Sequence, residues 1–168
     1  MLRILSCTIL ALTLCAGTAR GAEVDLDLTF GLSDERQDST NQFSFGALVT
    51  MGEANWWLRP EVGLQRKTYP VFGGLDREFT VGAVRAWKFD KHRFYLGAGY
   101  AHANFQQGAN EGSSSGPFAR AGIMWPIGGG RFSMGVDGKV AWLRPWHPFG
   151  VPFEAAYSQV ALRIGWRL

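Results

Sequence analysis

The sequence predicts an all-β protein, an eight-stranded antiparallel up-and-down transmembrane β-barrel. Three observations carry this prediction. Apolar residues recur at every second position over most of the chain, which is the period of a strand with two unlike faces. The breaks between these runs alternate between short and long. Within the runs, one face is apolar and the other mixes charges with glycines.

Eight alternating runs account for the chain after residue 22. The last run illustrates the pattern, because apolar residues from Val160 to Leu168 alternate with Gln, Ala, Arg and Gly. Breaks that contain Gly, Pro, Asn or Asp separate the runs, as expected between strands. We therefore expect strands over residues 24–32, 42–51, 56–67, 78–89, 93–105, 117–127, 131–143 and 156–168.

The breaks indicate how the two ends of the barrel differ. Three are short enough for tight hairpin turns, and four are longer and more polar. The short breaks are 51–55, 90–92 and 128–130, and the long ones are 33–41, 68–77, 106–116 and 144–155. With an even number of strands both termini fall on the short-turn side, which is the periplasmic side of a bacterial membrane barrel.

Residues 1–21 have the layout of a cleaved secretory signal peptide, which leaves 22–168 as the barrel domain. Arg3 precedes the apolar run 4–14, and small residues follow before Ala22,. Both cysteines, Cys7 and Cys15, lie in this segment, so we expect neither disulfides nor thiolate metal sites. Without Arg3 and Arg20, 15 basic residues stand against 14 acidic ones. The charge therefore says little about a nucleic-acid partner. We expect none because an exported protein does not meet nucleic acid, and we expect no cofactor.

The distribution of aromatic and charged residues favours a membrane barrel over a soluble one. Tryptophans near the strand ends are expected at the membrane interfaces; they are Trp56, Trp87, Trp125, Trp142 and Trp166. The opposite face carries charges of both signs among many glycines, as a narrow lumen requires. We expect a lumen network of Asp25, Asp27, Arg59, Glu61, Glu78, Arg120, Asp137, Lys139 and Arg163. Lys67 shares this face.

The pattern of strands and loops resembles the small eight-stranded outer-membrane barrel families, of the type of the outer membrane protein A membrane domain and outer membrane protein X. The terminal run ALRIGWRL resembles the C-terminal signal that the outer-membrane assembly machinery reads, so we expect that machinery to bind 160–168. The run ends on Leu168, where such signals usually end on Phe or Trp. The resemblance implies a monomer in the outer membrane of a Gram-negative bacterium.

A candidate catalytic site lies in YAHANFQQGANEG, residues 100–112. It resembles the outer-membrane lipid A deacylases, whose motif places a His two residues before a Ser. Asn104 occupies the serine position here, and Ser113–Ser115 are expected too far along the loop to replace it. His102 and Glu111 remain as weak catalytic candidates. The histidines His92, His102 and His147 have no ligand spacing, so we expect no metal site.

Basic residues at the expected outer ends of strands are candidates for contact with lipopolysaccharide phosphates. They are Arg66, Lys67, Arg77 and Arg144. The connection 144–155, rich in proline and aromatic residues, suits contact with an extracellular partner. The expected function is therefore structural, adhesive or interactive, without catalysis. The alternatives are a lipid A-modifying enzyme of the deacylase type and a small-solute pore.

Overall fold

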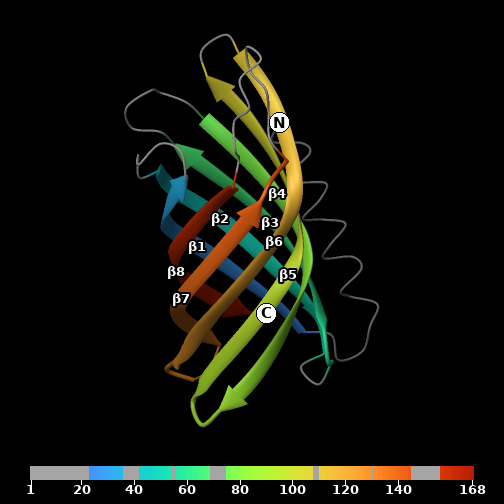
Figure 1. The fold of residues 1–168 in the computed structure, drawn as a ribbon. Coiled ribbons are helices and arrows are strands. Elements are labelled where there is room, and N and C mark those ends of the chain that lie inside the picture. The colour runs from blue at the N-terminus through green and yellow to red at the C-terminus, as the bar shows by residue number, and fades with distance from the viewer. Residues whose placement is uncertain are drawn as a thin grey trace.

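The chain forms a closed barrel of eight antiparallel strands in a computed structural model, which describes residues 23–35, 42–53, 56–68, 75–107, 110–129, 131–144 and 156–168. Each strand pairs with the next along the chain, so the fold is the predicted up-and-down barrel (Figure 1). The strands are β1 Glu23–Glu35, β2 Gln42–Gly52, β3 Arg59–Thr68, β4 Leu75–Phe89, β5 His92–Gln107, β6 Asn110–Ile127, β7 Phe132–Trp142 and β8 Ala156–Arg167.

Pairing between the first and last strands closes the cylinder. β1 and β8 run antiparallel, with Phe30 opposite Leu162 at the middle of the seam. The amide of Leu168 donates to the carbonyl of Val24 over 2.9 Å, so the seam extends to the end of the chain. Closure matters because an unpaired strand edge cannot be tolerated in hydrocarbon. No helix in the part of the chain that the structure describes is long and apolar enough to cross a membrane.

The short connections lie at one end of the barrel, called here the short-turn end. Between β4 and β5, Asp90 adopts a positive φ of 53°, and Gly128 does so after β6 with a φ of 60°. Asp and Gly tolerate this backbone region better than most residues. After β2, Gly52 has a φ of 117° and the amide of Trp56 donates to the carbonyl of Glu53. Trp56–Leu58 therefore precede β3, which begins at Arg59 rather than at residue 56.

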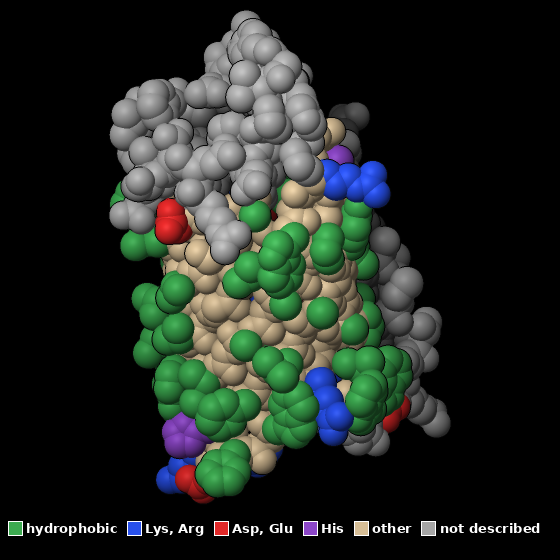
Figure 2. Space-filling view, viewed as in Figure 1, with side chains coloured by type: hydrophobic (Ala, Val, Ile, Leu, Met, Phe, Trp, Pro, Cys, Tyr) green, Lys and Arg blue, Asp and Glu red, His purple; other side chains and the backbone are tan. Residues whose placement is uncertain are grey.

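The outer wall is apolar, as the alternation predicts. Hydrophobic side chains cover the barrel between its two ends (Figure 2), and Phe30, Leu96 and Leu162 are among the exposed ones. The five predicted interface tryptophans all lie on this exposed surface. Four of them sit at the short-turn end, and Trp142 ends β7 at the opposite, loop end. This inversion, with apolar residues outside and charges inside, is the signature of a membrane barrel.

The expected loop at 106–116 is wrong, because most of it is strand. β5 continues to Gln107 and β6 already begins at Asn110. The two strands stay paired from Arg93 opposite Met124 to Gln107 opposite Asn110. Polar Ser, Asn and Gly residues are acceptable here because a strand that extends beyond the bilayer does not need an apolar face. The predicted signal peptide, 1–21, and most of the connection 144–155 lie outside the described residues.

Candidate functional site

The centre of the lumen is an interlocked set of ion pairs. Arg120 on β6 binds Asp137 with two nitrogens, at 2.8 and 3.2 Å, and Glu61 with a third, at 2.7 Å. Arg163 on β8 lies 2.5 Å from Asp27 and 3.5 Å from Glu61. All five side chains are buried. Glu61 thus joins the two arginines, and each charge has an opposite charge beside it.

A second cluster lies nearer the loop end and centres on Glu78 of β4. Its carboxylate accepts hydrogen bonds from Lys139 and from the hydroxyl of Tyr157, and Lys67 lies 3.5 Å away. The Lys67 ammonium also lies 3.0 Å from the centre of the Tyr157 ring, close enough for a cation–π contact. Glu78 is 1 % exposed and Lys67 is 2 % exposed.

This position of Lys67 corrects the expectation that it contacts lipopolysaccharide at the rim. Alternation along β3 turns Lys67 to the same side as Arg59 and Glu61, and the Glu78 carboxylate holds it there. Lys67 also completes the charge balance of the lumen. Together with the nine predicted members it gives five carboxylates and five cations, all of them buried.

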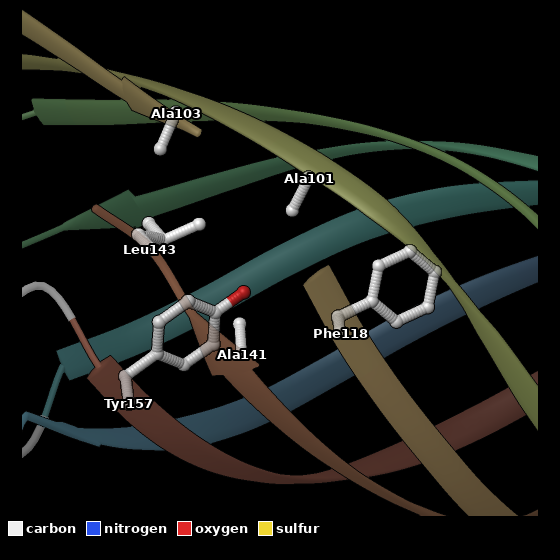
Figure 3. Packing of buried hydrophobic residues seen from close by; sticks show 6 residues of the cluster. All are labelled: Ala101, Ala103, Phe118, Ala141, Leu143 and Tyr157. Carbon is white, nitrogen blue, oxygen red and sulfur yellow. The ribbon is translucent and has the colours of Figure 1, made fainter. Parts of the chain in front are cut away.

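Aromatic and small side chains occupy the remaining lumen at the loop end. Ala101, Ala103, Phe118, Ala141, Leu143 and Tyr157 form a buried cluster there (Figure 3). Below this cluster, a cavity of about 20 Å³ lies among Gln65, Thr80, Arg120 and Gln159, which is room for about one water molecule. Gly97 leaves room for the Arg120 side chain, because a Cβ at this position would lie only 3.0 Å from it. The lumen is therefore packed rather than open at its centre and toward the loop end.

On the outer wall, His102 of β5 and Ser115 of β6 form a hydrogen-bonded pair. They lie directly opposite each other in the register, with His102 Nδ1 2.7 Å from Ser115 Oγ. This contradicts the expectation that Ser113–Ser115 are too far from His102, which assumed a loop where the hairpin continues. Arg144, which follows β7, is the neighbour of Ser115 on the side away from His102. Its amide donates to the carbonyl of Ser115 over 3.0 Å.

Glu111 does not lie beside His102, contrary to the expected proximity of the two. Its backbone pairs with Gln106, four residues further along β5, which is on the order of 13 Å at 3.3 Å per residue. Asn104 is exposed on the wall and pairs with Ser113. Among the described residues, no three His, Cys, Asp or Glu side chains cluster as metal ligands would.

The remaining rim candidates lie on the exposed outer wall near the loop end. Arg66 of β3 and Arg77 of β4 are directly opposite each other in the register, and Arg144 lies beyond the end of β7. Arg66 also borders a groove of about 430 Å³ with Phe30, Phe43 and Phe45. The rings of Phe30 and Phe45 are 5.2 Å apart. Cationic and aromatic side chains thus meet on one part of the wall, a juxtaposition that becomes visible only once the strand register is known.

These features define a closed barrel with a lipid-facing exterior and a charged, packed interior. Solved structures with the same fold include Neisserial surface protein A, with a TM-score of 0.65 and 14% identity over 87% of this chain and 96% of that one. Ail, the attachment invasion locus protein of Yersinia pestis, has a TM-score of 0.56 and 14% identity over 88% of this chain and 97% of that one. The outer membrane enzyme PagL has a TM-score of 0.54 and 18% identity over 84% and 97%.

The chain therefore has the fold of the small eight-stranded outer-membrane barrels. No protein-family model matches the sequence, and no curated protein matches it.

Proposed function

We propose that the chain is an outer-membrane protein of a Gram-negative bacterium, with a closed lumen and an outer wall that binds lipopolysaccharide. Its role is structural or one of surface interaction. The short-turn end faces the periplasm and the loop end faces outward. Two proteins with this fold, Neisserial surface protein A and the attachment protein Ail, support a surface role.

The observation that carries this proposal is the placement of Arg66 opposite Arg77. Both side chains are exposed on the outer wall near the loop end. A phosphate between them would accept charge-assisted hydrogen bonds from both guanidinium groups. The neighbouring groove of Phe30, Phe43 and Phe45 offers an apolar surface for acyl chains. Phosphate and acyl chains occur together in lipopolysaccharide.

The test compares two double variants of the purified barrel in neutral detergent. R66Q/R77Q removes the facing pair, and K91Q/R131Q removes the same charge at the short-turn end. We expect R66Q/R77Q to weaken lipopolysaccharide binding in calorimetry by about tenfold or more, since the loss of one charged hydrogen bond weakens binding by about tenfold to a hundredfold. The control double variant should bind as the wild type does. Equal binding by all three proteins contradicts the proposal.

Two further interactions are part of the proposal. The segment that the assembly machinery would bind is 160–168, the end of β8 together with Leu168. Exchanging Trp166 and Leu168 for Ser should lower the yield of folded barrel in cells. The connection 144–155 is the candidate for contact with an extracellular partner and lies mainly outside the described residues. Deleting 145–153 and measuring binding to host cells or matrix tests that adhesive role.

A second candidate function, hydrolysis of an acyl ester in the outer leaflet, is favoured by the 2.7 Å contact between His102 and Ser115. In this chemistry the Ser115 hydroxyl attacks the ester carbonyl while His102 Nδ1 takes its proton. The imidazolium returns the proton to the leaving alkoxide, and water then releases the acid from the acyl-serine. The exposed Asn104 amide is a candidate donor to the oxyanion,.

Mass spectrometry of lipid A tests this second function. Cells that express the wild type, S115A or S113A are compared, because Ser113 is a neighbouring serine on the same strand that does not pair with His102. Loss of an acyl chain with the wild type and S113A but not with S115A supports hydrolysis. Identical lipid A from all strains excludes it and leaves lipopolysaccharide binding untouched.

A further inference from the structure

A second cavity lies inside the barrel at the short-turn end and has a volume of about 490 Å³. This volume is in the range of small-molecule binding sites. All eight strands contribute to its lining, from Asp25 on β1 to Arg167 on β8. Most of the wall is therefore strand, and Trp56, Lys91 and Arg131 add to it from the short connections. In the proposed orientation the cavity belongs to the periplasmic side.

The cavity carries a large excess of positive charge. Among its described lining residues, seven are Lys or Arg and two are Asp. One of these, Asp25, already contacts three arginines: Arg59 at 2.7 Å, Arg93 at 3.3 Å and Arg167 at 3.0 Å. A single carboxylate neutralises only one of them. Arg167 also lies 3.5 Å from Glu23, which still leaves more cations than carboxylates.

Three further cations line the cavity without an acidic partner. Lys88, Lys91 and Arg131 form no ion pair with any carboxylate that the structure describes. This contrasts with the lumen beyond the cavity, where Lys67, Arg120 and Lys139 stand against Glu61, Glu78 and Asp137. Like charges gathered in a low-dielectric concavity repel one another and raise the local concentration of anions.

Two buried arginines of the cavity lining have N–H groups with no hydrogen-bond acceptor among the described residues. Arg59 and Arg163 are 6 % and 5 % exposed. Arg59 Nε and Arg163 Nε and Nη1 have no hydrogen-bond acceptor among the described residues. Arg163 Nη1 lies 3.9 Å from Asp137, which is within ion-pair distance but too long for a hydrogen bond. Buried donors are nearly always satisfied in proteins, so these three N–H groups are available to an acceptor that enters the cavity.

We infer that this cavity binds a small, soluble anion that carries two or more phosphate or carboxylate groups. One anionic group reaches the donors of Arg59 and Arg163, and another lies among Lys88, Lys91 and Arg131. Arginine forks match both phosphate and carboxylate oxygens. The cavity is enclosed by the strands, so its ligand comes from the aqueous phase rather than from the lipid. This inference is independent of lipopolysaccharide binding at the opposite end.

Calorimetry on the purified barrel in neutral detergent tests the site, with tripolyphosphate and citrate as probes and acetate as the monovalent control at equal ionic strength. We expect the multivalent probes to bind and acetate not to bind. K88Q/R131Q should weaken binding of the multivalent probes by about tenfold or more, because it removes two charged contacts. R66Q/R77Q, which removes the same charge from the outer wall, should leave the affinity within about twofold, since exposed charges that far away are screened.

Heat-modifiable migration on gels establishes that each variant is folded. Binding of only one of the two probe classes supports the site and identifies whether its ligand is a phosphate or a carboxylate. Two results overturn the inference: no binding of either multivalent probe to the wild type, or an equal loss in K88Q/R131Q and R66Q/R77Q, which indicates attraction to net charge alone. If a variant loses lipopolysaccharide binding but still binds the multivalent anions, the result bears on the outer wall and not on the cavity.

Discussion

Lys67 on β3 and Glu78 on β4 form an ion pair inside the barrel, with 3.5 Å between the ammonium and the carboxylate. Glu78 is also the acceptor for Lys139 and Tyr157. E78Q would leave two ammonium groups buried without a counter-charge. We expect it to lower the free energy of unfolding by about 3–5 kcal/mol, measured by urea titration in lipid vesicles with tryptophan fluorescence.

The matched variant K67M removes the other side of this pair. Glu78 then keeps Lys139 and Tyr157, so we expect a loss of only about 1–2 kcal/mol, mainly one charged contact. A loss as large as that of E78Q would mean that Lys139 does not neutralise Glu78. No loss at all would mean that Lys67 is solvated at the rim after all.

The strands and the two faces of the wall follow from alternation, which needs no information from distant residues. Lys67 illustrates the limit of this approach. The alternation along its strand places the Lys67 side chain in the lumen, whereas its position at the end of the alternating run suggests the rim. The ion pair with the Glu78 carboxylate on the next strand holds it in the lumen. Sequence alone does not reveal that partner, because the pairing register depends on where both strands end.

The pair of His102 and Ser115 was missed for the same reason. The residues between them are rich in Gly, Ser and Asn, which disfavour strands on average and so indicate a loop. In the structure each strand supplies the other with hydrogen-bond partners up to Gln107 and Asn110. Pairing overrides the weak local preference and brings two residues 13 positions apart into contact. The run GSSSG on 112–116 has no apolar alternation, so the sequence carries no signal for this pairing.

The packed lumen predicts that the barrel does not conduct. Planar bilayers containing the wild type should show no defined conductance steps, because the space beside Arg120 holds about one water,. The variant R120A/R163A removes both central cations and leaves Asp27, Glu61 and Asp137 without their partners. We expect it to conduct with cation selectivity. Reproducible steps from the wild type would contradict the closed lumen.

Arg85 is a charge on the lipid-facing wall near the short-turn end. Its guanidinium carbon lies 4.7 Å from the centre of the Trp57 ring and 4.9 Å from that of Trp87. Such contacts stabilise by about 0.5–1 kcal/mol each at exposed sites. In a double-mutant cycle of R85L and W87L, we expect a coupling of that size in the free energy of unfolding. A coupling of zero would mean that Arg85 extends to the lipid headgroups without using the tryptophan.

Gly122 on β6 gives room to the Tyr95 side chain, whose hydroxyl donates to Asp137. A Cβ at Gly122 would overlap the Tyr95 phenol and lie 2.5 Å from the carbonyl oxygen of Val136. We expect G122A to lower the free energy of unfolding by about 1–3 kcal/mol, the usual range for overpacking a core. Urea titration in lipid vesicles measures this loss.

Gly138 on β7 provides the matched control, because a Cβ there would meet only the carbonyl oxygen of Ala121, at 3.7 Å. G138A should therefore be neutral or stabilise the barrel by up to about 1 kcal/mol, since alanine restricts the unfolded chain more than glycine does. The difference between the two variants isolates crowding of the lumen from the general effect of replacing a strand glycine. Equal effects of G122A and G138A would mean that the interior yields to an extra methyl group, and that its glycines are not placed to make room for the buried network.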